Sequence, residues 1–543
     1  MKIKISKYRS IYIIIFYAVL ALLMYLTIRA KFVWYGDDTY YHFIRIMGLS
    51  DNFKQGMLQS GVTTNFFGKI GYGVNIFYPW ITLIPFTFFE MLTNSWIQAY
   101  YLGLMFYFFI SFLISHYAMK QFSGNTFQAI IFAVIYGFST YRLIDFFSRA
   151  ALAEYISTVF LPLCFLGFYN LFFGDGKNWK PLAIGMSMII LSHILTTFMC
   201  VLLFIVILII FYAKVKLDKS RVINFFKAVG MTILATLIFT VPFIAEETFQ
   251  KYGMPSPQKL QGKSLLSLVK ASFMNVSGRQ YEGFIYNIGL VLILALIVGA
   301  VLFRKFDASI KGIFILAVLT FFMSSSFFPW KLLEMTPVKV IQFPFRNLMF
   351  ATLFAAVVAS KCLVILVQNS RINVIVAIVA MTFLSAGLWY HSFNRALVGS
   401  YISQKNLLIT EEMADKGRIP ENYLDQYVPK KSQDDLTKIE QHEGYINDKT
   451  FNQIPGIQNG KNYFEIKNVK KGDVLDLPYI RYRFTRILLN DEVGQLLPSK
   501  RGTVKFVAPK NFDKLRIQIS YDVPAFQLLF ILSALAWLIL IVI

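Results

Sequence analysis

Long apolar runs recur along most of this chain. Thirteen can be counted, the first being "IYIIIFYAVLALLMYLTI" at 11–28. About 20 apolar residues in a helix are what a bilayer accommodates. Only 15% of the 543 residues are charged, against about 25% in a soluble domain. The sequence predicts a polytopic α-helical membrane protein. Its first run is too long for a signal-peptide core and lacks a small-residue cleavage site, so we expect a retained helix.

Basic residues in short loops predict how these helices are oriented. "MKIKISKYR" at the N-terminus, "KVKLDKSR" at 214–221 and "RKFDASIK" at 304–311 should face the cytoplasm. If all thirteen runs crossed the membrane, 214–221 would face outside, so one run does not cross. We assign this role to 78–92, "YPWITLIPFTFFEML", as a re-entrant or interface-lying segment. About 12 transmembrane helices then remain in the cytoplasmic membrane, although a different short run elsewhere would restore the parity equally.

A second region differs in kind from the apolar runs. The segment 391–523 holds 17 of the 30 acidic residues, and its second half alternates in the strand manner, as in "GTVKFVAP" and "KLRIQISYDV". We predict a small extracytoplasmic β-sandwich-like domain there. The expected organisation is a transmembrane module at 1–391 with outer loops at 30–77 and 139–155, the β-rich domain at 392–523 and a C-terminal transmembrane helix at 524–543.

Acidic residues outside the β-rich segment are few enough to be counted. Thirteen remain, of which Asp175, Asp218 and Asp307 fall in predicted cytoplasmic loops and Glu90 ends the re-entrant run. A carboxylate base on the outer face would therefore be one of nine residues: Asp37, Asp38, Asp51, Asp145, Glu154, Glu246, Glu247, Glu282 and Glu334.

The stretch "FVWYGDDTYYHFIRI" at 32–46 places charges beside the first apolar run. Asp38, His42 and Arg45 are spaced i, i+4 and i+7, so they would share one face of a helix over 39–55. The other positions are largely apolar, which predicts an amphipathic helix at the membrane interface. The alternative is that Asp37 or Asp38 caps the helix and the rest is a solvated face.

The second outer loop, "STYRLIDFFSRAALAEY" at 139–155, gathers four charged residues. Arg142 and Asp145, and Asp145 and Arg149, have ion-pair spacing on a helix, and Glu154 follows. A structural lattice of salt bridges is one interpretation. The other is that the arginines hold a phosphate, because a guanidinium matches phosphate bidentately.

Two further polar residues interrupt apolar segments. His193 in "LSHILTT" is either a satisfied buried histidine or part of a site. Arg346 in "IQFPFRNL" is either a snorkelling interface cation or a phosphate ligand. The net charge of +23 is spread over membrane loops, which fits an anionic membrane and lipid-phosphate substrates rather than nucleic acid.

Several motifs in order carry a family resemblance. "GDDTYYHFIRIMGL", "GKIGYGVNIFYPWITLIP", "YRLIDFFSRAALAEYISTVFLPL", "SHILTT" and "IQFPFR" resemble bacterial membrane proteins labelled as 6-pyruvoyl-tetrahydropterin-synthase-related, a domain name that does not imply pterin chemistry. The family looks like a branch of the GT-C glycosyltransferases, near relatives of the membrane protein that helps to glycosylate lipoteichoic acid. The resemblance covers most of 1–400.

This resemblance implies a GT-C-like fold with interface helices in the first outer loop, and it implies chemistry. By motif position Asp38 is the expected base and Asp37 the second choice. His42, Arg45, Arg142, Arg149, His193 and Arg346 are candidates for binding the donor phosphate, and Asp145 and Glu154 occupy the region where such enzymes place another acid. The second loop lacks a clear second-Asp motif, which departs from the family pattern.

The implied activity is an inverting glycosyltransferase reaction on the outer face of the membrane. A hexosyl group would move from polyprenyl phosphate, such as undecaprenyl phosphate, to a cell-envelope acceptor: teichoic acid or wall polysaccharide of a Gram-positive bacterium. An Asp–Asp pair would also suit a divalent cation, but one pair is a weak motif and no metal is assigned. The alternatives are a polysaccharide or lipid transporter, which should show inverted repeats and midplane charges, and a non-catalytic envelope assembly protein.

Overall fold

The computed structural model describes residues 2–57, 61–255, 259–278, 285–367, 370–421 and 424–542. The chain forms two compact units. Unit 1 comprises Met1–Thr39, Ser95–Thr232 and Pro257–Lys416, and unit 2 comprises Tyr40–Asn94, Ile233–Ser256 and Gly417–Ile543. Of the nine acids counted above, Glu282 lies outside the described residues.

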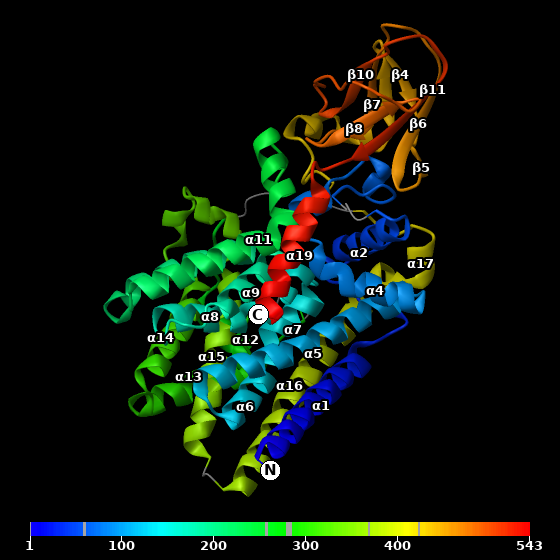
Figure 1. Cartoon of the computed structure of the whole chain (residues 1–543). Coiled ribbons are helices and arrows are strands. Elements are labelled where there is room, and N and C mark those ends of the chain that lie inside the picture. Colours follow the sequence, from blue (N-terminus) through cyan, green and yellow to red (C-terminus); the bar gives the residue numbers. More distant parts are fainter. Residues whose placement is uncertain are drawn as a thin grey trace. The chain divides into compact units, whose positions relative to one another are not determined.

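Unit 1 is built almost entirely from helices (Figure 1). In its centre α8 packs against α5 and α9, and α15 packs against α6, α13 and α14. The helices are α1 (Lys2–Ile28), α5 (Trp96–Ser123), α6 (Thr126–Gly137), α7 (Thr140–Leu143), α8 (Leu152–Phe172), α9 (Lys180–Ile190), α10 (Ile194–Ile210), α12 (Leu265–Met274), α13 (Leu290–Leu302), α14 (Ala308–Met323), α15 (Leu348–Leu366), α16 (Arg371–Gln404) and α17 (Glu411–Asp415).

Two glycines let α8 and α9 lie against each other at backbone distance. A Cβ at Gly167 would lie 2.0 Å from the backbone nitrogen of Leu182, and one at Gly185 would lie 2.5 Å from that of Cys164. Small residues at such crossings allow close helix packing in membranes. The turn that follows α9, which carries His193, is thereby held against α8.

The apolar helices differ in length. Six in the described part are long and apolar enough to cross a bilayer, and a bent pair, Thr126–Gly137 with Thr140–Ser148, makes a seventh at most. Others, such as α9 and α14, are shorter. Ile81–Thr93 is also in the shorter group, and such a helix reaches about 20 Å against the ~30 Å of a hydrocarbon core. The number of 12 crossings and the re-entrant role of 78–92 stay predictions.

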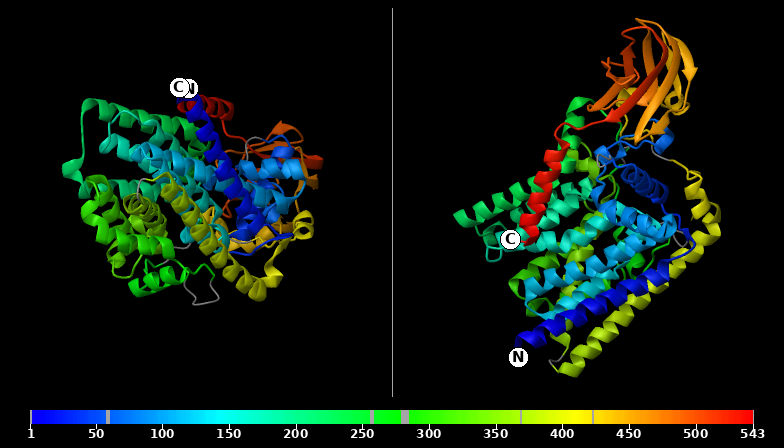
Figure 2. Two further views of the ribbon diagram at one scale, coloured as in Figure 1. Left: turned by 90° about the horizontal axis from the view of Figure 1, so that it is seen from below. Right: turned by 45° about the vertical axis from the view of Figure 1, so that its right-hand side comes forward.

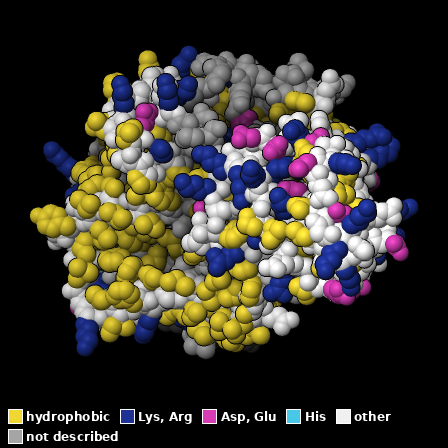
Figure 3. Space-filling view, turned by 90° about the horizontal axis from the view of Figure 1, so that it is seen from above, with side chains coloured by type: hydrophobic (Ala, Val, Ile, Leu, Met, Phe, Trp, Pro, Cys, Tyr) yellow, Lys and Arg dark blue, Asp and Glu magenta, His cyan; other side chains and the backbone are white. Residues whose placement is uncertain are grey.

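The surface agrees with a membrane environment. Large hydrophobic side chains are exposed on several helices, among them Leu23 of α1, Val301 of α13 and Phe383 of α16. Figure 3 shows hydrophobic side chains gathered over a broad area, and elsewhere in the same view charged side chains of both signs interspersed. Soluble monomers rarely expose contiguous apolar surface on this scale. These faces are suited to contact with lipid.

Unit 2 contains helix α2 (Thr39–Lys54) from its second residue, α3 (Val74–Phe77), α4 (Ile84–Thr93), α18 (Leu436–Glu440), α19 (Phe526–Val542) and the C-terminal end of α11 (Lys219–Phe249), which begins in unit 1. The helix predicted over 39–55 is present as α2, but every residue of 39–50 is buried, so no solvated face is found there; its position at the membrane interface stays a prediction. The segment that follows folds back against α2: the Ser50 hydroxyl donates to Glu90 at 2.7 Å, and Lys54 pairs with Glu90 at 2.6 Å.

The C-terminal part of unit 2 is rich in strands, as predicted, and the strands form two sheets (Figure 2). One sheet has the order β10-β7-β3-β4 and the other β5-β6-β11-β8-β9. Alternate residues of both sheets, such as Leu477, Val504 and Ile517, form one hydrophobic core. The strands are β3 (Glu443–Ile446), β4 (Lys449–Asn452), β5 (Gly456–Gln458), β6 (Lys461–Val469), β7 (Val474–Ile480), β8 (Thr485–Leu489), β9 (Glu492–Val493), β10 (Thr503–Val507) and β11 (Phe512–Tyr521).

Three of its hairpins turn through two left-handed residues. The pairs are Asn447–Asp448, Asn459–Gly460 and Asn490–Asp491, all with positive φ. Asn, Asp and Gly tolerate this conformation, which matches the twist of the flanking strands. Helix α16 continues to Gln404, and the first strand of the two sheets begins at Glu443; the boundary at residue 392 stays a prediction.

Candidate active site

Five charged residues of unit 1 lie where three chain segments converge: the loop before α2, the segment from α7 to the start of α8, and the turn before α15. The middle segment contains a π-helical turn, Ile144–Ser148. Such turns widen the helix by one residue and are frequent at functional sites. Here the turn carries Asp145 and brings Arg149 to its end.

The first segment is held against the second by backbone contacts. Strand β1 (Phe32–Val33) pairs with β2 (Ile409–Thr410), and the chain then passes close to the π-helical turn. A Cβ at Gly36 would lie 2.5 Å from the carbonyl oxygen of Phe147, so only glycine fits there. The backbone N–H of Asp38 donates to the carbonyl of Arg149 at 2.9 Å. Asp38 is therefore fixed beside Arg149.

Arg149 and Arg346 join the buried acids of this site. Nη1 of Arg149 lies 2.6 Å from Asp145 and 3.0 Å from Glu154, and Nε of Arg346 lies 3.1 Å from Glu154. Tyr141 donates a hydrogen bond to the other oxygen of Glu154 at 2.9 Å. All five residues are at most 8% exposed. We call Asp145, Arg149, Glu154 and Arg346 the ion-pair network.

Both guanidinium groups of the network lie over aromatic rings. Arg149 lies 5.1 Å from the ring centroid of Phe345, and Arg346 lies 5.2 Å from that of Phe343. Such contacts stabilise a cation where water is excluded. Among the described residues, Oδ2 of Asp145 has no hydrogen-bond partner. The network thus holds two arginines and two acids, and one acid is incompletely satisfied.

Asp38 has an unusual electrostatic environment for a carboxyl group outside the spanning helices. Its pKa is raised from 3.8 to about 6, mainly by burial and also by Asp37 and Glu154, while Arg149 and Arg346 act to lower it. Its side chain nevertheless keeps some exposed surface, and within the described ranges its carboxylate accepts no hydrogen bond. A carboxylate with this pKa suits proton abstraction near neutral pH. Asp37, the other candidate, lies next to it in the same turn and is also partly exposed.

His193 joins the same end of unit 1 through hydroxyl groups. It caps α10, and its Nδ1 lies 2.8 Å from the hydroxyl of Thr196. Ser157 donates to Thr196 at 3.1 Å or to the backbone carbonyl of Glu154 at 2.6 Å. A short chain of polar groups therefore connects His193 with the first turn of α8.

Arg142 does not take part in the ion-pair network. Its guanidinium donates to the Thr158 hydroxyl at 3.0 Å and the Tyr136 carbonyl at 3.3 Å, and it lies over the rings of Tyr136 and Tyr155. The expected pair of Arg142 with Asp145 is not formed in the described structure. Their spacing suits an α-helix, but the π-helical turn begins between them and changes the angle at which Asp145 projects.

His42 and Arg45 belong to unit 2, whereas Asp38 belongs to unit 1. The two share a face of α2, as predicted, with Arg45 Nη1 at 3.4 Å from His42 Nδ1. Arg45 is fully buried and donates to the carbonyls of Tyr78 and Pro79 at 3.1 and 2.8 Å. Asp38 is not on that helical face, because α2 begins at Thr39.

Sequence reasoning missed two contributors to the site. Tyr141 was not predicted because charged residues alone indicated the site, and a phenol is uncharged at neutral pH. Gly36 was overlooked because its importance depends on the approach of Phe147, more than 100 residues away in sequence. The quoted motifs "GDDTYYHFIRIMGL" and "YRLIDFFSRAALAEY" do contain both residues, but only as parts of a pattern.

Long apolar helices, lipid-facing surface and a buried charged site define this chain as a multi-pass membrane protein with an additional β-sandwich. A family model described as a 6-pyruvoyl-tetrahydropterin synthase related domain of membrane proteins matches residues 77–395. The chain belongs to this family.

Comparison with other proteins adds two findings. No match was found among curated proteins. Among solved structures, ArnT from Cupriavidus metallidurans bound to undecaprenyl phosphate is similar with a TM-score of 0.36 and 12% sequence identity, covering 72% of this chain and 75% of that chain.

Proposed function

We propose that this protein is a membrane glycosyltransferase that moves a sugar from a polyprenyl-phosphate donor to a cell-envelope acceptor. The observation that carries the proposal is the position of Asp38. A carboxylate with a pKa of about 6 lies beside two arginines that can receive a phosphate. A base and cationic groups for the leaving phosphate are what glycosyl transfer from a lipid phosphate requires.

The reaction follows from these roles. The acceptor hydroxyl attacks the anomeric carbon, and its proton passes to Asp38. The bond between that carbon and the phosphate oxygen breaks, and the electron pair leaves with the lipid monophosphate. Arg149 and Arg346 stabilise the phosphate, exchanging part of their pairing with Asp145 and Glu154 for phosphate oxygens. Attack opposite the leaving group inverts the anomeric centre.

The finer assignments are part of the same proposal. The donor lipid is undecaprenyl phosphate, the sugar is a hexose, and the acceptor is teichoic acid or a wall polysaccharide of a Gram-positive bacterium. The site faces the outside of the cytoplasmic membrane, as the basic loops at 214–221 and 304–311 indicate. Asp37 tunes Asp38, and His193 orients the first turn of α8. Arg142 supports the fold around the site, and His42 and Arg45 support the fold of unit 2.

The experiment is sugar transfer by purified protein in proteoliposomes, with undecaprenyl-phosphate hexoses as donors and teichoic acid or wall polysaccharide as acceptor. Asp38→Asn should lower the rate at least about 100-fold, the usual contribution of a general base. Asp51→Asn is the matched control: the same substitution, in an acid whose carboxylate accepts from Gln55 at 2.9 Å. It should keep the wild-type rate.

Folding is checked in parallel with a thiol-reactive dye. The dye reacts only on unfolding, because the three free cysteines, Cys164, Cys200 and Cys362, are buried. Both variants should have the same melting temperature as the wild type. Wild-type rates in Asp38→Asn would refute the base assignment. No transfer by the wild type from any donor would refute the enzyme proposal and favour a transporter or assembly protein.

A further inference from the structure

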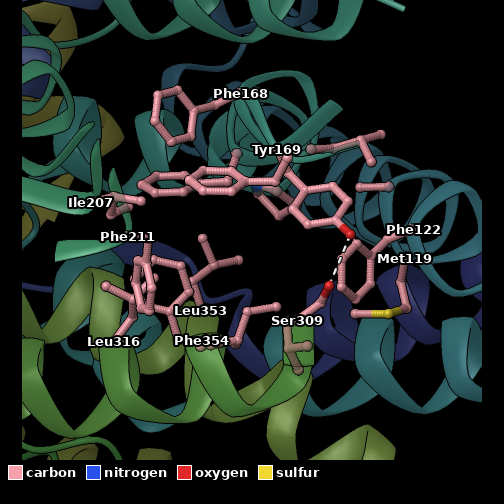
Figure 4. Close-up of a pocket in the computed structure, with 18 of the residues that line it drawn as sticks. Met119, Phe122, Phe168, Tyr169, Ile207, Phe211, Ser309, Leu316, Leu353 and Phe354 are labelled. Atoms are coloured by element: carbon pink, nitrogen blue, oxygen red, sulfur yellow. Dashed lines mark hydrogen bonds between the residues drawn. The ribbon is translucent and has the colours of Figure 1, made fainter. Parts of the chain in front are cut away.

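Unit 1 contains a second feature, at the opposite end of α8 from the ion-pair network. Glu154 lies in the first turn of α8 and Tyr169 in its last, about 22 Å further along the helix. Around Tyr169 a pocket of about 280 Å³ opens between α5, α8, α10, α14 and α15. Figure 4 shows its lining side chains pointing into the space between these helices. The proposed reaction uses none of them.

The pocket wall is almost wholly apolar. Phe168 of α8, Ile207 of α10, Leu316 of α14 and Leu353 of α15 line it. One polar contact crosses the lining, a hydrogen bond of 2.9 Å between the hydroxyls of Tyr169 and Ser309 (Figure 4). Because these hydroxyls satisfy each other, the pocket offers a ligand little besides hydrocarbon contact. A flexible alkyl chain suits such a wall.

The pocket also has a basic rim. Lys214 and Lys216, both exposed, line it where α10 ends. Within the described residues neither has an acidic partner. Asp218, the one acid in this loop, pairs instead with Arg221, whose Nε lies 3.0 Å from Asp218 Oδ2. The backbone N–H of Arg221 also donates to the Asp218 carboxylate. The two ammonium groups are thus available to an anionic ligand.

We propose that this pocket binds an anionic glycerophospholipid, with an acyl chain between the helices and the phosphate at Lys214 and Lys216. Charge complementarity selects this occupant over a neutral lipid, since lysines beside membrane helices attract anionic head groups. The separation along α8 distinguishes it from the glycosyl donor, whose phosphate belongs at Arg149 and Arg346. The loop 214–221 is predicted to be cytoplasmic, so the lipid comes from the inner leaflet.

The test is photo-crosslinking of the full-length protein in nanodiscs, with phosphatidylglycerol carrying a diazirine at the end of one acyl chain. Peptide mapping should place the label on pocket-lining residues such as Phe168, Leu316 or Leu353. Unlabelled phosphatidylglycerol should compete about tenfold better than phosphatidylcholine, given the two lysines at the rim. The protein should crosslink without any glycosyl donor present, so the result is independent of the proposed activity.

Two variants separate the head-group contact from the chain contact. Lys214→Glu with Lys216→Glu should reduce labelling about tenfold, whereas Lys177→Glu with Lys219→Glu, the same charge change at exposed lysines that do not line the pocket, should not. Gly312→Leu fills the pocket, because a Cβ there meets only Phe211 at 3.6 Å. It should abolish labelling while the melting temperature stays at the wild-type value.

Three results would overturn the proposal. Equal competition by phosphatidylcholine, with no effect of the rim variants, would mean unspecific lipid contact. Stronger competition by undecaprenyl phosphate than by phosphatidylglycerol would make the pocket part of donor binding. Labels outside the pocket would show that the alkyl chain lies elsewhere.

Discussion

The ion-pair network of unit 1 and the buried Glu246 of unit 2 are stabilised in different ways. In unit 1 carboxylates meet guanidiniums, as in the pairs of Arg149 with Asp145 and Glu154. In unit 2 Glu246 is fully buried and accepts from the hydroxyls of Tyr252 and Tyr521 and from a backbone N–H. Among the described residues it has no cationic partner.

This difference distinguishes a cluster that can bind an anionic ligand from a contact that only stabilises the fold. Hydroxyl groups and backbone N–H groups are held in place by the fold. They stabilise one buried carboxylate and offer no cation that a ligand could bind. Paired arginines can trade a carboxylate oxygen for a phosphate oxygen at similar geometry. The Arg45 guanidinium, bound to two carbonyls and over the ring of Tyr78, is held like Glu246, by groups that the fold fixes in place. The exchangeable ion pairs of unit 1 therefore support the proposed location of the active site in that unit.

The largest expected effect comes from removing a cation from each unit. Arg149→Met leaves Asp145 buried without its cationic partner and Glu154 paired with Arg346 alone, which should lower the free energy of unfolding by about 3–5 kcal/mol. Arg45→Met leaves only carbonyl groups unpaired and should cost about 1–3 kcal/mol. Thermal unfolding followed with the thiol-reactive dye compares the two. Adding Asp145→Asn to Arg149→Met should restore part of the loss, and equal losses in the two single variants would contradict the distinction.

A smaller effect is expected from the buried acid of unit 2. Glu246→Gln replaces one acceptor oxygen by a donor facing Tyr252, Tyr521 or the backbone N–H of Arg483, so stability should fall by about 1–3 kcal/mol. Sugar transfer per folded molecule should be unchanged, because Glu246 belongs to unit 2 and the ion-pair network to unit 1. The measurement is the specific rate after correction for the folded fraction. A rate loss beyond that correction would place chemistry in unit 2.

Arg346→Lys tests whether the network needs the shape of a guanidinium. Arg346 donates through Nε to Glu154 and through Nη1 to the Ile341 carbonyl at 2.7 Å, and an ammonium cannot reach both with the same geometry. We expect kcat/KM for the donor to fall about tenfold, or about 1.4 kcal/mol of transition-state stabilisation. Steady-state kinetics over a range of donor concentrations measures this. An unchanged value would mean that charge alone suffices.

The smallest effect concerns pH. A base must be deprotonated, so the rate should rise through the Asp38 pKa of about 6. Asp37 raises that pKa, so Asp37→Asn should move the midpoint to lower pH. The folded pKa lies above the unfolded value of 3.8, so the Asp38 contribution to stability is lost as pH rises from about 4 to about 6. Rate profiles from pH 5 to 8 measure the midpoint, and a shift to higher pH would contradict the assignment.

Much of the architecture follows from local pattern. Apolar runs predicted membrane helices, and alternation at 502–509 and 514–523 predicted strands that are present as β10 and β11. The exact number of crossings did not follow, because hydropathy reports composition and not helix length. The sequence of helix α9 is as apolar as that of a membrane-spanning helix, but the helix has only 11 residues.

The membership of the site could not be read from spacing. Arg142, Asp145 and Arg149 look equivalent in a helical pattern, yet the π-helical turn pairs Asp145 with Arg149 and leaves Arg142 among Tyr136 and Thr158. Likewise Asp38, His42 and Arg45 fit one helical face, but α2 starts one residue after Asp38. A single residue of helix boundary or one altered turn is beyond what periodicity resolves.

The amino-acid sequence by itself determined the class of protein, the strand-rich C-terminal region and the short list of acids from which a base can come. These depend on composition and on patterns within one element. Only the tertiary structure decided that Asp38 lies beside Arg149 and that Arg346 pairs with Glu154, 192 residues away. Such pairs form between distant segments because a buried charge without a partner is strongly destabilising. The packing of the helices determines which oppositely charged side chain is close enough to pair.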